Sequence, residues 1–258
     1  MTAQTVVAPA AQVAARASAR AGRSGKHDPT WKRILIHGTL SLAALIAVFP
    51  VIRVLSVSLR PADELLERNF QLVPPGATLA NFGHVLTETN FLPWIFNSLI
   101  ITIGTSLIGL VFAATSAYAF SRYKFPGRGV GLTALLATQL IPATMLIVPL
   151  YVLAASYDFI GLGTYRGLLI AYSVTSVPFS IWILKGYYDT VPVELEEAAM
   201  VDGCSQLEAF WRILIPLSAP ALVIVFLFNF LAAWNEYVLA NVFVGSVPGM
   251  NPFASAVP

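Results

Sequence analysis

Five long apolar runs dominate this sequence and decide what the chain can fold into. They cover residues 34–58, 94–120, 130–155, 164–188 and 213–243. A helix of about 20 mainly apolar residues crosses a bilayer, whose core admits only helices or closed barrels because it holds no water for unpaired backbone groups. These runs are too long and too continuously apolar for barrel strands. The sequence therefore predicts an all-α integral membrane protein with about five transmembrane helices.

The composition agrees with a membrane location and narrows the functional classes. Hydrophobic residues make up 57% of the chain and charged residues 11%, whereas a soluble domain has about 25% charged residues. A net charge of +2 is too small to indicate a nucleic-acid partner. The single cysteine, Cys204, excludes an internal disulfide and a cysteine-built metal site. The sequence has no nucleotide-binding motif, and we expect no cofactor on this chain.

The basic residues predict the orientation, because Lys and Arg concentrate on the cytoplasmic side of membrane proteins. With a cytoplasmic N-terminus, the inner side receives Arg16, Arg20, Arg23, Lys26, Lys32, Arg33, Arg122, Lys124, Arg128, Lys185 and Arg212. Only Arg53, Arg60, Arg68 and Arg166 then lie at or beyond the outer ends. Residues 1–30 are rich in Ala and Arg, as transit peptides also are, but lack a clear amphipathic stripe, so we expect a disordered cytoplasmic tail.

A charged segment at 190–216 interrupts the apolar runs and reads as helix, turn, helix. Pro192 suits the first turn of a helix, and the acids that follow it suit the positive end of the helix dipole. Gly203 predicts the end of this short helix. Ser205 and Glu208 match a capping box, which starts the next helix.

Small residues on the first of these helices indicate a possible docking face. Ala199 and Gly203 are four residues apart, with Ala198 beside them, so the sequence predicts a smooth surface that another chain can approach closely. The segment is either a docking helix or an interfacial helix that lies on the membrane surface. Residue chemistry alone leaves both open.

The stretch EAAMVDGCSQLEAFWRILIP, from Glu197 to Pro216, resembles the EAA signature of ABC-importer permeases. That signature has Glu-Ala-Ala, three residues, Gly, nine residues and then Ile-x-x-Pro; Ile215 stands where Leu is usual. The wider chain resembles the shorter permease of the maltose-type branch, through SLRPADEL, PPGATLANFGHVL, FNSLIIT, SAYAFSRYKFPGR and AAWNEYVLA. The resemblance covers residues 34–245.

The resemblance implies an importer-type ABC permease fold over residues 31–258, with a cytoplasmic coupling helix. This helix would insert into a groove of an ATP-hydrolysing subunit, and the residues that match the coupling core are Glu197, Ala198, Ala199 and Gly203. The implied partners are a second permease in a heterodimer, two ATP-binding subunits, an extracytoplasmic solute-binding protein and membrane lipid, with no nucleic acid. The implied activity is import of sugars by alternating access, without enzymatic activity on this chain.

Polar residues within the apolar runs are candidates for a translocation path, because such residues usually face a bundle interior or a cavity. They are Gln139, Tyr172, Asn229, Asn235 and Glu236, and Trp234 is a further candidate because its ring could stack on a sugar. Each could instead form interhelical hydrogen bonds, or anchor the chain at the interface in the case of the aromatic residues.

The end of the chain departs from the pattern that the resemblance implies. Family members normally have six helices, so we expect the final helix to be missing after SVPGMNPFASAVP. Two other functional classes stay open on the residues alone. An ion-coupled secondary transporter needs intramembrane acids, of which Glu236 is the candidate, and a membrane enzyme needs a site that the scattered His27, His37 and His84 do not suggest.

Overall fold

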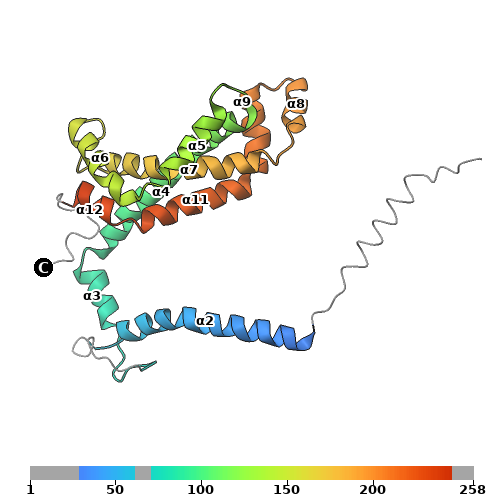
Figure 1. The fold of residues 1–258 in the computed structure, drawn as a ribbon. Coiled ribbons are helices and arrows are strands. Elements are labelled where there is room, and N and C mark those ends of the chain that lie inside the picture. Colours follow the sequence, from blue (N-terminus) through green and yellow to red (C-terminus); the bar gives the residue numbers. More distant parts are fainter. Residues whose placement is uncertain (1–28, 62–70, 246–258) are drawn as a thin grey trace, which may run out of the picture. The chain divides into compact units, whose positions relative to one another are not determined.

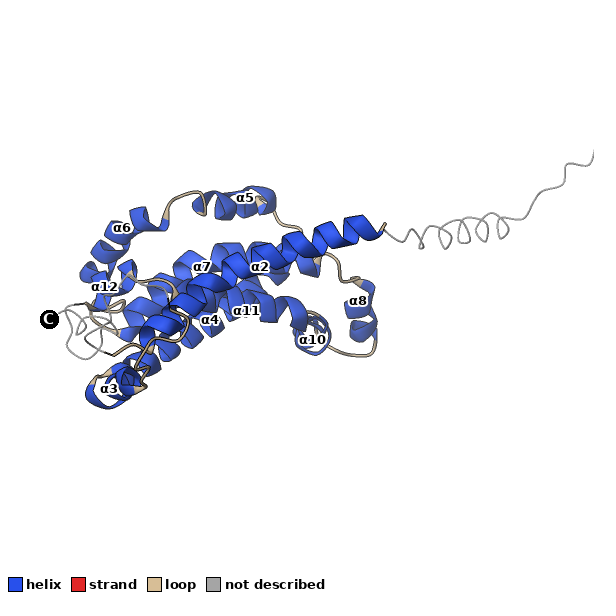
Figure 2. Ribbon diagram, turned by 90° about the horizontal axis from the view of Figure 1, so that it is seen from below, coloured by secondary structure: helices blue, strands red, loops and turns tan. Residues whose placement is uncertain are grey.

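The computed structural model describes residues 29–61 and 71–245, and every regular element in these ranges is helical (Figure 2). This confirms the all-α prediction. The expected N-terminal tail and the expected loss of a final helix fall largely or wholly outside the described residues. The chain divides into two compact units, residues 1–87 and 88–258.

The first unit contains α2 (Thr30–Ser58) and most of α3 (Ala80–Glu88). α2 covers the first apolar run and is long enough to cross a membrane. The Asn81 side-chain amide at the start of α3 donates hydrogen bonds to the carbonyls of Ser58, at 3.0 Å, and Arg60, at 2.7 Å. These bonds hold the chain that follows α2 against α3.

The second unit is built around three long helices that lie side by side: α4 (Phe91–Arg122), α7 (Tyr165–Tyr188) and α11 (Ala219–Trp234) (Figure 1). α4 faces its neighbours with small residues such as Ala113 and Ala117, both fully buried. Small residues let helix backbones approach closely, which is how membrane helices gain packing contacts. Leu184 of α7 and Val225 of α11 complete this part of the core.

The third apolar run is broken near Pro142. It forms α5 (Arg128–Thr138) and α6 (Ala143–Ser156), which meet at an angle of 101°. Pro142 explains the break, because it has no backbone N–H to donate and disfavours helix in the residue before it. The run is thus a broken span or a re-entrant loop.

The fifth apolar run is more broken than predicted. It follows α9 (Gln206–Ala209) and contains the end of the π-helical turn η2 (Phe210–Leu214), α10 (Ile215–Leu217), α11 and most of α12 (Val238–Val244). The chain bends by 78° at Ser218, between Pro216 and Pro220, which cannot supply the N–H groups of a continuous helix. It breaks again after Trp234, so the expected helix over 213–243 is wrong as a continuous element.

The described residues contain three helices that are long and apolar enough to span a membrane, α2, α4 and α7, and up to five spans if each bent pair counts as one. The predictions for 94–120 and 164–188 are confirmed within three residues at each end. Around α4, α7 and α11, the short helices α8 (Glu194–Val201) and α9 lie at one end, whereas α6 and α12 lie at the other (Figures 1 and 2).

Candidate functional site

The helix α8 forms as the sequence predicts and ends in a Schellman motif. Glu194, Glu196 and Glu197 occupy its first turn, where the helix dipole favours acids. Gly203 has φ of +93°, and its N–H bonds the carbonyl of Met200 at 3.1 Å. The next N–H reaches back to Ala199 O at 3.0 Å. This pair of bonds satisfies the last carbonyls of the helix and needs a residue that tolerates positive φ.

The second helix of the segment starts with the predicted capping box. The Ser205 hydroxyl accepts from the backbone N–H of Glu208 at 3.3 Å, and the Glu208 carboxylate accepts from the backbone N–H of Ser205 at 2.9 Å. Such a box satisfies two otherwise unpaired N–H groups. The prediction of helix, turn, helix is confirmed.

The four residues of the implied coupling core do not share one face. Glu197 and Ala198 are exposed, Ala199 is buried at 9% exposure, and Gly203 lies beyond the end of the helix. The prediction of a smooth face made by Ala198, Ala199 and Gly203 is therefore wrong. A helix of eight residues turns successive side chains by about 100°, so adjacent alanines point in different directions.

The exposed side of α8 instead combines acids with large apolar side chains. Leu195, Met200 and Val201 are exposed, Val201 at 88%. Leu207 in α9 and Trp211 in η2 are also exposed. Apolar side chains grouped on a surface mark binding sites. These residues carry no distinct signal in the sequence, because apolar side chains are common throughout this chain.

The inner side of α8 is fixed by a buried ion pair, which the sequence also does not signal. Arg122 Nε donates to Glu196 Oε1 at 2.6 Å, and both side chains are about 5% exposed. Tyr118 Oη donates to the other carboxylate oxygen at 2.9 Å. The Arg122 guanidinium also donates to the carbonyls of Tyr188 and Val191, each at 3.0 Å. One arginine at the end of α4 thus binds the end of α7, the following loop and α8.

A second ion pair lies at the same end of the helices but does not involve α8. Asp189 accepts from Lys185 at 2.6 Å and from the Ser121 hydroxyl at 2.7 Å. Partial burial alone would raise the pKa of Asp189, but the hydrogen bonds from Lys185 and Ser121 and the nearby positive charges of Lys185 and Arg128 outweigh it and lower the pKa. Asp189 joins α7 to α4.

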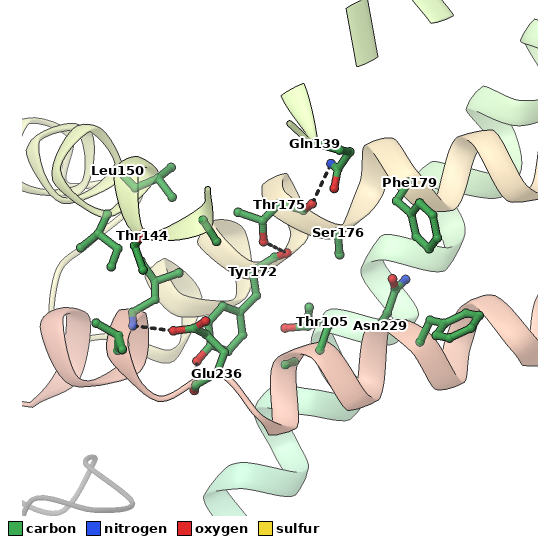
Figure 3. A pocket seen from close by; sticks show the side chains of 17 residues that line it. Thr105, Gln139, Thr144, Leu150, Tyr172, Thr175, Ser176, Phe179, Asn229 and Glu236 are labelled. Atoms are coloured by element: carbon green, nitrogen blue, oxygen red, sulfur yellow. Dashed lines mark hydrogen bonds between the residues drawn. The ribbon is translucent and has the colours of Figure 1, made fainter. Parts of the chain in front are cut away.

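A cavity of about 370 Å³ lies in the second unit, among α4, α6, α7, α11 and α12 (Figure 3). Four of the six predicted path residues line it: Gln139, Tyr172, Asn229 and Glu236. Trp234 instead lines a second cavity of about 360 Å³, which shares Tyr172 and Glu236 with the first. Asn235 lines neither of these two cavities, and its side-chain amide donates to Leu231 O at 2.7 Å.

Glu236 has a structural task in this cavity. One of its carboxylate oxygens accepts from the backbone N–H of Leu239 at 2.8 Å, and its backbone carbonyl accepts from the Tyr172 hydroxyl at 2.9 Å (Figure 3). The carboxylate therefore caps the start of α12. The signal for this cap in the sequence was an acidic residue, Glu236, three positions before Leu239 in the apolar segment that follows.

Asn229 is held between helices. Its Oδ1 accepts from the Ser180 hydroxyl of α7 at 2.9 Å, and the residue is 3% exposed. A Cβ at Gly109 of α4 would lie 3.0 Å from Asn229 Nδ2, so this glycine makes room for the amide. Of the remaining candidates, Gln139 is exposed and donates to Thr175 O at 3.3 Å. The ring of Trp234 stacks on Phe230 with centroids 5.6 Å apart, which occupies one of its faces.

Comparison with known proteins gives consistent matches. Residues 106–257 match the family described as binding-protein-dependent transport system inner membrane component. The chain is 34% identical to the maltose/maltodextrin transport system permease protein of Escherichia coli, over 83% of this chain and 77% of that protein. It is 32% identical to a diacetylchitobiose uptake system permease protein of Streptomyces coelicolor, over 76% and 70%.

The fold also matches a solved structure. The crystal structure of a bacterial ABC transporter involved in the import of the acidic polysaccharide alginate contains a chain that superposes with a TM-score of 0.76 at 25% identity. The match covers 90% of this chain and 81% of that one.

Proposed function

This chain belongs to the family of binding-protein-dependent transport system inner membrane components, and from that premise we propose that it is the sugar-translocating permease of an ATP-driven importer, coupled to ATP hydrolysis through α8. It is a multi-pass inner-membrane protein of the ABC-permease type. The relatives named for maltose, maltodextrin and diacetylchitobiose support a carbohydrate as the solute.

The observation that carries the coupling role is the two-sided character of α8. Glu197 is exposed with the apolar side chain of Val201 one turn later on the same face, while the inner side of the helix is fixed by the buried Glu196. An amphipathic helix with exposed apolar anchors suits a groove on a partner protein. Glu197 adds a carboxylate that would make strong charge-assisted bonds to basic groups of an ATP-binding subunit. Gly203 sets the turn that presents the helix.

The proposed assembly has this chain in a heterodimer with a second permease, two ATP-binding subunits and an extracytoplasmic solute-binding protein. The N-terminus is cytoplasmic in this proposal, which puts the end of α4 and α8 on the cytoplasmic side together. The contact between Arg122 and Glu196 supports this arrangement, because it requires both to lie on one side of the membrane.

Closure of the ATP-binding subunits would move α8, and the helices around the cavity would open alternately to the two sides. We propose that the cavity lined by Gln139 and Tyr172 belongs to this chain's half of the path. Asn229 and Glu236 serve packing and capping in the described geometry. The alternative of an ion-coupled transporter loses support, because its candidate acid Glu236 caps α12.

The test uses the complete complex in proteoliposomes, with ¹⁴C-labelled maltose and diacetylchitobiose as probes. We compare Glu197→Lys and Gly203→Asp with the parent chain, and use Glu194→Lys as a control for charge on the same helix. We expect both variants to lose ATP-driven uptake and to retain less ATP-binding subunit on purification, whereas Glu194→Lys keeps more of both. Normal uptake by both variants would show that α8 is only a surface turn.

A further inference from the structure

We infer that Tyr118 and Arg122 are positioning residues that transmit movement of α8 to α4 through Glu196. This inference rests on the proposed coupling role of α8 and adds the route by which its movement reaches the cavity. The route is the ion pair between Arg122 and Glu196 together with the hydrogen bond from Tyr118.

Chain connectivity explains why α4 needs such a route. Short connections join α8 to α7 before it and to α9 after it, so its two neighbours in sequence are linked to it through the backbone. Arg122, at the end of α4, is 74 residues from Glu196 along the chain. Its connection to α8 is therefore through side chains, and Arg122 and Tyr118 make the hydrogen bonds.

The bonds around Glu196 make a rigid connection between α8 and α4, as transmission of movement requires. Both oxygens of the Glu196 carboxylate are bound, one by Nε of Arg122 and the other by the Tyr118 hydroxyl. The planar guanidinium is itself fixed by two carbonyls, those of Tyr188 and Val191. Phe210 packs on the Tyr118 ring, with centroids 4.7 Å apart. Such a group cannot slide without breaking several bonds at once.

An ion pair at this position is not explained by stability alone. Burying two charges costs desolvation, and apolar residues of similar size often stabilise a fold equally well. A bound carboxylate does fix one relative position of two helices, because its hydrogen bonds are directional. The two neighbouring acids of α8 thus have different roles: Glu196 binds α4, and Glu197 faces outward.

Movement delivered at Arg122 reaches the cavities along α4. Thr105 of α4 lines the first cavity and Ser98 of α4 lines the second. A helix rises 1.5 Å per residue, so Thr105 lies about 25 Å along the axis from Arg122. A continuous helix carries a displacement over this length, and the described α4 has no break between them.

The test places one cysteine reporter on α4 and another on α7, in separate preparations of the complete transporter with Cys204→Ser and no other cysteines. The reporters are Ser98→Cys on α4 and Thr175→Cys on α7, which line the second and first cavity. The measurement is the rate of maleimide labelling of each reporter, without nucleotide and in the ATP–vanadate state. It needs no knowledge of the transported solute.

The test variants are Glu196→Gln, which keeps the side-chain volume, and Tyr118→Phe, which removes one hydroxyl. Tyr118→Phe is the milder change and serves as the test if Glu196→Gln does not assemble. The matched control is Asp189→Asn, because Asp189 binds Ser121 of α4 at the same end but does not contact α8 through its hydrogen bonds. ATP hydrolysis by each complex is measured alongside.

We expect nucleotide to change the labelling rate at both reporters in the parent and in the control. In Glu196→Gln and Tyr118→Phe, the change is lost or reduced at Ser98→Cys and kept at Thr175→Cys, while ATP hydrolysis continues. If both reporters respond normally in these variants, the proposed route to α4 is wrong although α8 can still couple. If both fail together, Glu196 and Tyr118 are needed for all coupling, and a route specific to α4 is wrong. If neither reporter responds in the parent, the proposed function of α8 fails as well.

Discussion

Gly109→Ala tests whether Asn229 packs the helices together or serves the translocation path. The new Cβ would lie 3.0 Å from Asn229 Nδ2 and 3.4 Å from the Ser176 hydroxyl, so the amide has to move. Overpacking of this kind costs about 1–3 kcal/mol. Replacing a helical glycine by alanine returns about 0.5–1 kcal/mol. The expected net destabilisation is therefore about 0–2.5 kcal/mol.

Asn229→Ala completes a double-mutant cycle. Alone, it removes the bond from Ser180 and costs about 0.6–2 kcal/mol, as interhelical hydrogen bonds in membranes do. In the double variant the alanine Cβ at position 109 enters the space that the amide has left. We therefore expect the double variant to be more stable than the sum of the two costs predicts, by about 1 kcal/mol.

The assay is thermal unfolding of the purified complex in nanodiscs, followed by tryptophan fluorescence, with sugar uptake measured in parallel. Gly186→Ala is the matched control, because no atom lies within 4 Å of its added Cβ, and we expect it to leave the midpoint unchanged or raise it. Additive costs would refute the packing role of Asn229. Loss of uptake in Asn229→Ala at unchanged stability would assign this residue to the path instead.

Three further predictions concern single positions. Gly203 has a φ of +93°, so Gly203→Ala should destabilise α8 by about 1–2 kcal/mol and Gly203→Asn by less. Hydrogen exchange of α8 measures this, and equal protection in both variants and the parent would contradict it. Because the pKa of Asp189 is lowered in the folded chain, its pair with Lys185 should stabilise the complex at pH values above the unfolded pKa of about 4, and this stabilisation should be lost as the pH falls further. The melting midpoints of the parent and Asp189→Asn measure it, and a difference between them that grows on acidification would contradict the prediction. Tyr172→Phe should cost about 0.6–2 kcal/mol by removing the bond to Glu236 O, measured as a fall in melting midpoint, and an unchanged midpoint would contradict the bond's contribution.

The positions of the spans could be predicted because the bilayer requires long apolar helices. The turn between α8 and α9 was predictable for a local reason: Gly203, Ser205 and Glu208 interact within a few residues of one another. The break at Ser218 was not predicted, since proline within an apolar run is common in membrane helices and its effect depends on neighbouring helices.

The ion pair of Arg122 and Glu196 could not be predicted from one sequence. The two residues are 74 positions apart, and each has an adequate local explanation, as a cytoplasmic-side cation and as an acid at a helix start. The prediction that Ala198 and Ala199 share one face was wrong for a related reason. Which side of a short helix faces inward depends on what it packs against, here the end of α4.

The docking of α8 on an ATP-binding subunit is the central claim, and site-specific photocrosslinking tests it most directly. A benzophenone side chain placed at Val201, which is 88% exposed, is compared with one at Val174, an exposed apolar position in the middle of α7. In the complete complex, the account predicts a crosslink from position 201 to the ATP-binding subunit and none to it from position 174. Absence of that adduct at 201, with crosslinks only to lipid, would contradict the account.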